Sequence, residues 1–221
     1  MNWEVKRLLA GKGVDILRFV DLSILPEKDR FGFDKAVLIG FALSKAFILD
    51  VYRNRPVEDE YLKKESDIEK MADWLADELN QRGYRAHSQS EKSIVKCKIA
   101  EPMYLDLATK RGFSVLPQKT VARLGGLGFI GKNNLLITEK YGCALVLCSV
   151  LTDAPITADH ALPVPQGCGM CNRCVEVCET KALSGKEWRG ERCEVLIDVE
   201  RCCCALKCMV ACPYTLHYAR S

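Results

Sequence analysis

The sequence contains no run of about 18 apolar residues, so it lacks the stretch that a membrane-spanning helix requires. Residues 1–11 are charged and contain no apolar signal core, so we expect no secretory leader and a cytoplasmic protein. Neither sign of charge is in large excess, because the 32 Lys and Arg residues are nearly balanced by 29 Asp and Glu residues. The resulting net charge of +3 gives by itself no reason to expect a nucleic-acid partner.

The composition is that of an ordinary globular protein, with 221 residues, 48% hydrophobic and 28% charged. This length allows one large domain, or a medium domain with a small module. Residues 154–165 contain three prolines and predict a linker. We therefore expect an α+β domain over residues 1–160 and a small cysteine-rich domain over residues 161–221.

Two parts of the first domain have the residue pattern of β-strands. Residues 35–43 are mostly apolar and predict a buried strand. Residues 135–138 and 143–151 are apolar or alternating around a Tyr-Gly turn, which predicts a hairpin.

Helix patterns are also present. Residues 66–82 follow the 3.6-residue period and predict a helix, with Ser66 and Glu69 forming a capping box. Residues 119–124 predict a short helix.

Cysteine is abundant, with 13 residues, of which nine fall in two blocks between Cys168 and Cys212. An odd count does not suit a secreted disulfide framework, and in a reducing compartment such blocks indicate metal. The other four cysteines are scattered, and we expect them to be small buried hydrophobes: Cys97, Cys143, Cys148 and Cys193.

The first block, Cys168, Cys171, Cys174 and Cys178, has the spacing C-x2-C-x2-C-x3-C of bacterial ferredoxins. Three thiolates on one loop bind one 4Fe–4S cluster, and the fourth binds the other cluster. Zinc is the competing interpretation, but zinc sites use two separated C-x2-C pairs. The unbroken run with a second block favours iron–sulfur clusters. Residue Glu179 replaces the proline that usually follows.

The second block is irregular and consists of Cys202, Cys203, Cys204, Cys208 and Cys212, followed by proline. Regular spacing would place a cysteine at 205, where the chain has Ala205. Exchange of the fourth ligands predicts one cluster on Cys168, Cys171, Cys174 and Cys212. The other cluster would use Cys178, Cys202 and Cys208 with Cys203 or Cys204, or with Cys193 as an outside candidate. Two adjacent clusters can have a purely structural role that stabilises the fold, but we expect these two to transfer electrons.

A G-x-G-x-x-G pattern occurs at Gly126, Gly128 and Gly131. No strong strand precedes it and no helix follows, so a dinucleotide-binding Rossmann site is rejected. The surrounding residues instead resemble epoxyqueuosine reductase and its relatives. The segments that carry this resemblance are 121–123, 126–138, 141–142 and 151–155, together with the cysteine module including 183–185 and 197–198.

The resemblance implies a nitroreductase-like N-terminal domain that binds cobalamin, next to a ferredoxin-like module with two 4Fe–4S clusters, a plan shared by reductive dehalogenases. It implies a corrinoid (or FMN) surface formed by Lys119, Arg123, Gly126, Gly128, Gly131, Lys132 and Asn133. Glycines allow close backbone approach, and Lys132 and Asn133 offer donors. The alternative is a packing turn with Lys132 as a solvated cation.

Some features depart from the family. Its proton-donating Asp has no counterpart in residues 111–118, and Asp106 is out of register. Tyr104, Asp106 and His87 are weak candidates for a proton source, and His160 and His217 receive no role. We also expect this chain to lack the C-terminal helical repeats that help relatives hold tRNA.

Three functions follow from the resemblance. The first is an oxidoreductase that passes low-potential electrons through the clusters to a corrinoid (or flavin) and an organic substrate. The second is an electron carrier that activates a partner such as a corrinoid protein. The third is a tRNA-modifying enzyme, which the weak charge disfavours. A reduced ferredoxin or flavodoxin is the expected electron donor.

Overall fold

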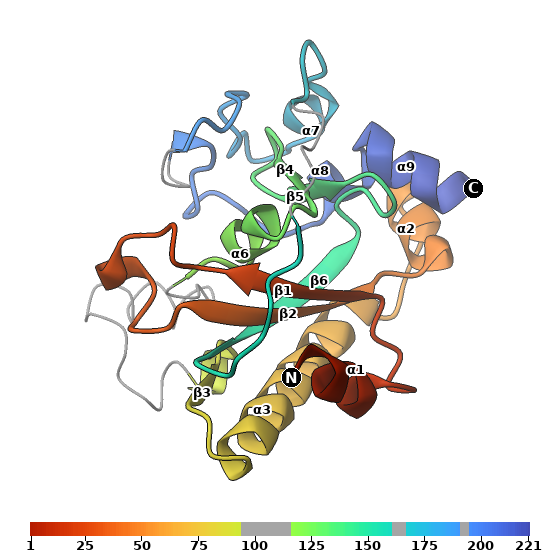
Figure 1. Cartoon of the computed structure of the whole chain (residues 1–221). Coiled ribbons are helices and arrows are strands. Elements are labelled where there is room, and N and C mark those ends of the chain that lie inside the picture. Colours follow the sequence, from red (N-terminus) through yellow and green to blue (C-terminus); the bar gives the residue numbers. More distant parts are fainter. Residues whose placement is uncertain (94–115, 161–166, 191–194) are drawn as a thin grey trace. The chain divides into compact units, whose positions relative to one another are not determined.

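The computed structural model describes residues 1–93, 116–160, 167–190 and 195–221 (Figure 1). The helices and strands are α1 Asn2–Leu9, β1 Ile16–Asp21, the 3-10 helix η1 Glu27–Asp29, β2 Lys35–Ala42, α2 Lys45–Tyr52, α3 Glu60–Gln81, β3 Ala86–Ser88, α6 Gln118–Leu124, β4 Gly128–Ile130, β5 Leu136–Thr138, β6 Leu145–Thr152, α7 Arg173–Glu176, α8 Lys207–Val210 and α9 Pro213–Arg220. In these ranges no helix combines the length and apolarity needed to cross a membrane.

The chain divides into two compact units that do not follow chain order. Unit 1 comprises residues 1–41, 61–126 and 146–161, and unit 2 comprises residues 42–60, 127–145 and 162–221. The glycine-rich segment is therefore divided, with Gly126 at the end of a unit 1 segment and Gly128 near the start of a unit 2 segment. The cysteine module forms only one of the three segments of unit 2.

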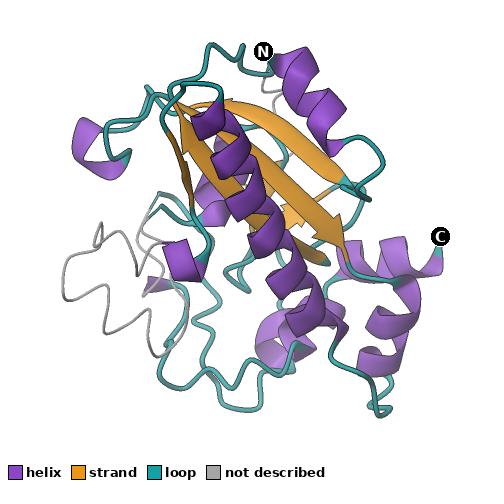
Figure 2. Cartoon of the chain, turned by 90° about the horizontal axis from the view of Figure 1, so that it is seen from below, coloured by secondary structure: helices purple, strands orange, loops and turns teal. Residues whose placement is uncertain are grey.

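Unit 1 is built on a four-stranded sheet in the order β1-β2-β6-β3. Strand β1 pairs antiparallel with β2, and β3 pairs antiparallel with β6. Helix α3 crosses one face of the sheet, while α6 packs against β1 on the other face (Figures 1 and 2). Because both faces are covered, residues 36–40 of β2 are all buried, and the prediction of a buried strand is confirmed.

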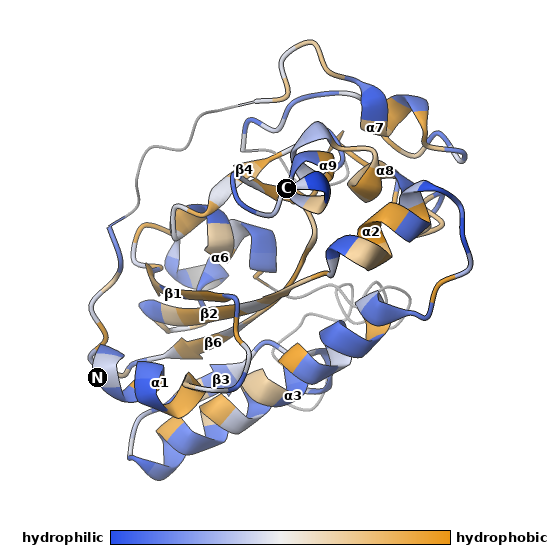
Figure 3. Cartoon of the chain, turned by 90° about the vertical axis from the view of Figure 1, so that its right-hand side faces the viewer, coloured by the Kyte–Doolittle hydropathy of each residue, from blue (hydrophilic) through white to orange (hydrophobic). Residues whose placement is uncertain are grey.

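Helix α3 presents an apolar stripe to the sheet and a polar face outward (Figure 3). The buried residues are Ile68, Ala72, Leu75, Ala76 and Leu79, spaced as the 3.6-residue period requires. The short helix predicted at residues 119–124 is also confirmed as α6.

The predicted start of the long helix at Ser66 is wrong, because α3 begins at Glu60. Ser66 therefore lies inside the helix and does not cap it. The Glu69 carboxylate instead accepts a hydrogen bond from the Glu91 N–H at 3.0 Å. Glu69, which matches a local capping pattern, therefore contacts a residue that is distant in sequence and does not cap the helix.

The predicted hairpin of residues 135–138 and 143–151 is also wrong. Strand β5 pairs antiparallel with β4, and only one bridge, between Thr138 and Gly142, joins it to the following turn. Strand β6 enters the four-stranded sheet instead, because a strand that is buried on both faces requires a central position.

Unit 2 packs four helices with the β4–β5 pair. Helix α2 contacts α8 and α9, and α8 also contacts α7. The Ser44 hydroxyl caps α2 by accepting from the Phe47 N–H at 3.1 Å, and the Glu60 carboxylate accepts from the Ser44 N–H and hydroxyl at 2.7 and 2.6 Å. These contacts fix the loops that surround the cysteines.

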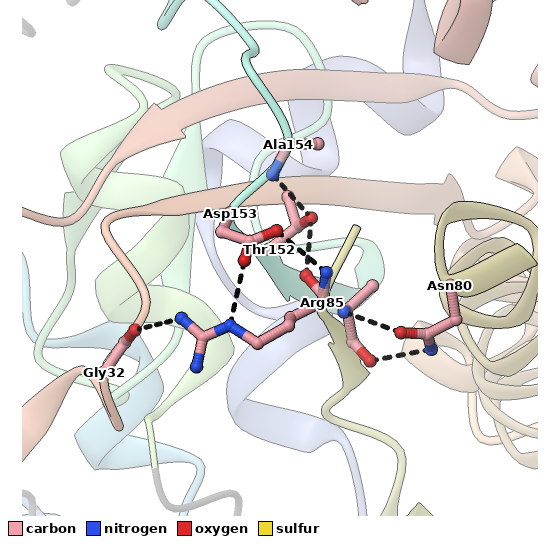
Figure 4. A network of polar contacts seen from close by, with 7 residues as sticks. Gly32, Asn80, Arg85, Thr152, Asp153 and Ala154 are labelled. Carbon is pink, nitrogen blue, oxygen red and sulfur yellow. Dashed lines mark hydrogen bonds and ion pairs between the residues drawn. The ribbon is translucent and has the colours of Figure 1, made fainter. Parts of the chain in front are cut away.

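The segment of residues 151–155, which carries part of the family resemblance, has a structural role in unit 1 (Figure 4). The Asp153 carboxylate accepts from the N–H and Nε of Arg85, both at 2.8 Å. Thr152 Oγ1 donates to the Arg85 carbonyl at 2.9 Å and accepts from the Ala154 N–H at 3.1 Å. This network joins the ends of β3 and β6.

We expect Asp153→Asn to lower stability at neutral pH by up to about 1 kcal/mol, since the pair is exposed and screened by solvent. The hydrogen bond from the Arg85 side chain holds the pKa of Asp153 below its usual range. Its contribution is therefore present above the ordinary carboxyl pKa and is lost as pH falls through the folded-state pKa. Thermal unfolding at pH 7 and below pH 4 measures this, with the exposed Asp77→Asn as control. An Asp153→Asn deficit that persists unchanged in acid would contradict the assignment.

Candidate metal centre

Three cysteines of the first block and the last cysteine of the second block line one small pocket of about 40 Å³ in unit 2. We call Cys168, Cys171, Cys174 and Cys212 the first set. Asn133, Ile137, Pro213 and Tyr214 complete the lining. Apart from the sulfur atoms, the Asn133 amide and the Tyr214 hydroxyl, the side chains that line the pocket are apolar.

Local structure explains how the first set converges. Cys168 and Cys171 lie on one tight turn in which the Cys171 N–H donates to the Cys168 carbonyl at 3.0 Å. Cys174 lies on α7, and Cys212 directly precedes α9, whose first residue is Pro213. Proline suits the first position of a helix because the N–H there has no helical partner.

Burial dominates the acid–base behaviour of the first set. It raises the pKa of Cys168, and it raises that of Cys174 to about 11, with the thiolates of Cys168 and Cys212 adding to the effect. Cys212 differs, because a hydrogen bond from Cys143 lowers its pKa to about 6. Binding of metal to such thiols therefore releases protons.

Cys143 is a buried neighbour of the first set. Its N–H donates to Thr215 Oγ1 at 3.0 Å, and its Sγ accepts from Asn133 Nδ2 at 3.2 Å. The preceding Gly142 has φ of +58°, and a Cβ there would collide with the Thr215 backbone. Glycine is therefore required for α9 to pack closely enough to bring Cys143 to Cys212.

Lys132 reaches the loop of the first set from the turn after β4. Its Nζ donates to the Gly169 carbonyl at 2.8 Å and to Asn172 Oδ1 at 3.0 Å. Its backbone N–H donates to Cys168 Sγ at 3.5 Å. The side chain is buried, with the residue only 7% exposed, so it is not the solvated cation of the alternative interpretation.

A second group of cysteines lies beside the first. Burial, together with the neighbouring thiolates of Cys174, Cys202 and Cys178, raises the pKa of Cys208 to about 12. Burial would also raise the pKa of Cys178, but hydrogen bonds from Thr180 and from backbone N–H groups outweigh it, so this pKa is lowered. Helices α7 and α8, which contain Cys174 and Cys208, contact one another, and Cys178 lies two residues after α7.

The irregular spacing of the second block is resolved by a backbone turn. Cys204 and Leu206 adopt φ of +52° and +57°, a conformation that non-glycine residues rarely adopt. The Sγ atoms of Cys202 and Cys204 lie 4.0 Å apart. We call Cys178, Cys202, Cys204 and Cys208 the second set. Cys203 is exposed, and no contact of its side chain brings it to the set.

The second set lies nearer to solvent than the first. Cys204 is exposed and lines a larger pocket of about 380 Å³ between α2, residues 54–59 and residues 204–207. Cys204 therefore brings the second set to the edge of this pocket.

The first set fits a 4Fe–4S cluster. In such a cluster each thiolate binds a different iron, so four cysteines surround a small space instead of meeting at one point. A pocket lined by four cysteines has this arrangement. In the ranges that the structure describes, no three His, Cys, Asp or Glu residues are placed to hold one metal ion.

The residues predicted to bind a corrinoid or flavin fall into two groups. Lys119, Arg123 and Gly126 belong to α6 and its end in unit 1. The other four are engaged inside unit 2: Gly128 and Gly131 pack against Ile137, Lys132 binds the loop of the first set, and Asn133 binds Cys143.

Several other predicted residues lie outside the described ranges: Cys97, Tyr104, Asp106 and Cys193. His87 is half-buried in unit 1, and burial lowers its pKa while Asp73 opposes the shift. His160 and His217 show no link to the cysteine sets in the described contacts. Cys143 and Cys148 are buried as expected. The sequence analysis treated Cys143 only as a small buried residue and missed its contacts beside the first set, although Cys143 directly follows residues 141–142 of the family resemblance.

Comparisons with known proteins give the same family that the motifs indicate. A curated epoxyqueuosine reductase from Lactococcus garvieae is 46% identical over 74 residues, which is 33% of this chain and 20% of that protein. A structure of epoxyqueuosine reductase with a modified tRNA stem loop has a TM-score of 0.58 at 17% identity, covering 96% of this chain and 66% of that chain. The resemblance to the epoxyqueuosine reductases is confirmed.

A catabolic reductive dehalogenase has the same fold, with a TM-score of 0.59 at 17% identity, covering 94% of this chain and 31% of that chain. No family model matches the chain. The chain spans less than two thirds of these epoxyqueuosine reductase and dehalogenase structures, and its aligned segment is a fifth of the curated epoxyqueuosine reductase.

Proposed function

We propose that this chain is an iron–sulfur oxidoreductase of the epoxyqueuosine reductase type, with one 4Fe–4S cluster on each cysteine set. The observation that carries the proposal is the pocket lined by the four thiols of the first set. When bound, each cluster supplies one-electron transfer at low potential. The proximity of Cys174 to Cys208 supports transfer between the sets.

We assign Cys204 as the fourth ligand of the second set, since its Sγ lies beside that of Cys202. The exposure of Cys203 and Cys204 makes the second set the entry point for a protein donor of the ferredoxin or flavodoxin class. Electrons then leave from the buried first set. In this arrangement unit 2 contains a ferredoxin-like module, residues 161–221, and the α+β part within residues 1–160 is nitroreductase-like.

The acceptor is the finer part of the proposal. A corrinoid, or alternatively a flavin, would use Lys119, Arg123 and Gly126, the predicted cofactor residues that belong to unit 1. The chemistry it would supply is reduction of an organic substrate. tRNA is the substrate class that the relative bound to a tRNA stem loop suggests.

A specific observation favours a second candidate, an electron carrier that activates a partner protein. Lys132 and Asn133, the strongest donors of the predicted cofactor surface, are buried and already bonded within unit 2. A chain without its own corrinoid or flavin would deliver electrons to a corrinoid protein instead.

Anaerobic purification with iron, sulfide, cobalt and flavin assays tests the proposal. We expect about eight irons per chain and a broad absorption band that bleaches with dithionite. Added cobalamin or FMN that binds and becomes reducible supports the oxidoreductase, and failure of both to bind supports the carrier. For tRNA, binding must weaken steeply with salt. A chain that binds no iron would overturn the proposal.

A further inference from the structure

The turn after β4 brings a buried cation to the first set. In the described part of the chain no carboxylate pairs with Lys132, which binds only the Gly169 carbonyl and the Asn172 amide oxygen. An unpaired buried ammonium is costly unless a negative charge lies close by. In this loop the Glu187 carboxylate accepts from the Gly169 N–H at 2.9 Å, but Glu187 is exposed, so solvent screens its charge.

A 4Fe–4S cluster bound to the first set would supply the negative charge that Lys132 lacks nearby. Four thiolates around a 4Fe–4S cluster carry a net negative charge, and reduction adds one more negative charge to it. A fixed cation beside the loop stabilises the reduced form more than the oxidised form, so it raises the reduction potential. The Lys132 N–H, which donates to Cys168 Sγ at 3.5 Å, acts in the same direction.

Cys143 contacts Asn133, which lines the same pocket. Its Sγ already accepts from Asn133 Nδ2, so its S–H is available as a donor. Its acceptors within reach are the Met209 carbonyl at 3.9 Å and Thr215 Oγ1 at 3.3 Å. Thr215 lies in the first turn of α9 directly after Cys212, and the lowered pKa of Cys212 indicates its sulfur as a third acceptor. A ligand thiolate is the strongest acceptor among these, because charge-assisted hydrogen bonds exceed neutral ones.

We propose that Lys132 and Cys143 are positioning residues that raise the reduction potential of the first cluster, Lys132 through its charge beside the Cys168 loop and Cys143 through an S–H donated to Cys212. The inference rests on the proposed function, because it requires a cluster on the first set. It gives residues of the glycine-rich segment a role toward the cluster.

Redox titration of the anaerobically purified full chain, followed by EPR, tests the inference with two pairs of variants. We expect Lys132→Met to shift the reduction equilibrium of one cluster roughly tenfold toward the oxidised form, which is about 59 mV for a one-electron couple. Lys132→Arg keeps the charge and should stay near the wild type. Cys143→Ala should shift the same cluster in the same direction, and Cys143→Ser should restore most of the change.

The midpoint potential of the other cluster serves as an internal control and should stay unchanged in every variant. The exposed Lys186→Met variant is a second control, and neither midpoint potential should shift in it. Unchanged midpoints in Lys132→Met and Cys143→Ala at full iron content would overturn the inference while leaving the proposed function intact. Loss of one cluster in all four variants would also overturn it, since it would show a purely structural role. If the wild type itself holds no cluster on the first set, the proposed function fails instead.

Discussion

Replacing Cys168 by alanine should reduce the iron content from about eight to about four per chain, because a 4Fe–4S cluster that loses one of its four thiolates is not retained. The nearest cysteines, Cys171 and Cys174, already bind the same cluster and cannot replace Cys168, and alanine has no atom that can bind iron. The absorption band near 400 nm should fall by about half. Iron and sulfide assays after anaerobic purification measure the change.

Cys148→Ala is the matched control for Cys168→Ala. Cys148 is a buried thiol of unit 1, and burial raises its pKa above the ordinary value, so it is an inert core residue. We expect this variant to keep its full iron content. If Cys168→Ala keeps about eight irons while its EPR spectrum is unchanged, the first set has been assigned to the wrong residues.

The second large effect is expected from Cys204→Ala, which should remove the other half of the iron. The turn at Cys204 and Leu206 brings Cys204 Sγ to 4.0 Å from Cys202 Sγ. The backbone conformation at each of these two residues costs on the order of 1–2 kcal/mol. Such strain is retained where it places a functional side chain.

The neighbouring Cys203→Ala variant is the natural control, since it removes a thiol one residue away and should leave the iron content unchanged. The outcomes separate the three open candidates. Loss of iron in Cys203→Ala alone would transfer the assignment to Cys203. Full iron in both variants would leave Cys193, which lies outside the described ranges, as the fourth ligand.

Local sequence patterns predicted the elements that depend on neighbouring residues. The apolar run of β2 and the short helix α6 were predicted within one residue of their observed starts. The spacing of Cys168, Cys171 and Cys174 also predicted that they share one short segment of chain. Cysteines separated by only two residues lie close enough to bind one cluster. The grouping of Cys212 with these three was predicted from ferredoxin spacing.

Predictions failed where distant segments competed for the same groups. Glu69 has the spacing of a capping box, but it binds the Glu91 N–H because the helix continues back to Glu60. Residues 143–151 have the pattern of a hairpin strand, but their two apolar faces are buried only in the centre of the sheet of unit 1. Periodicity contains no information on which of these partners is available.

The sequence by itself determined that this chain has two cysteine blocks of ferredoxin spacing and a segment similar to epoxyqueuosine reductases. It could not decide whether Lys132 and Asn133 face a cofactor or the protein, because the identity of a residue does not show whether its side chain is buried or exposed. The tertiary structure decided this by burying both residues against the cysteine loop and Cys143. It also gave Cys143 a role, since only the packing of α9 against Gly142 brings that thiol to Cys212.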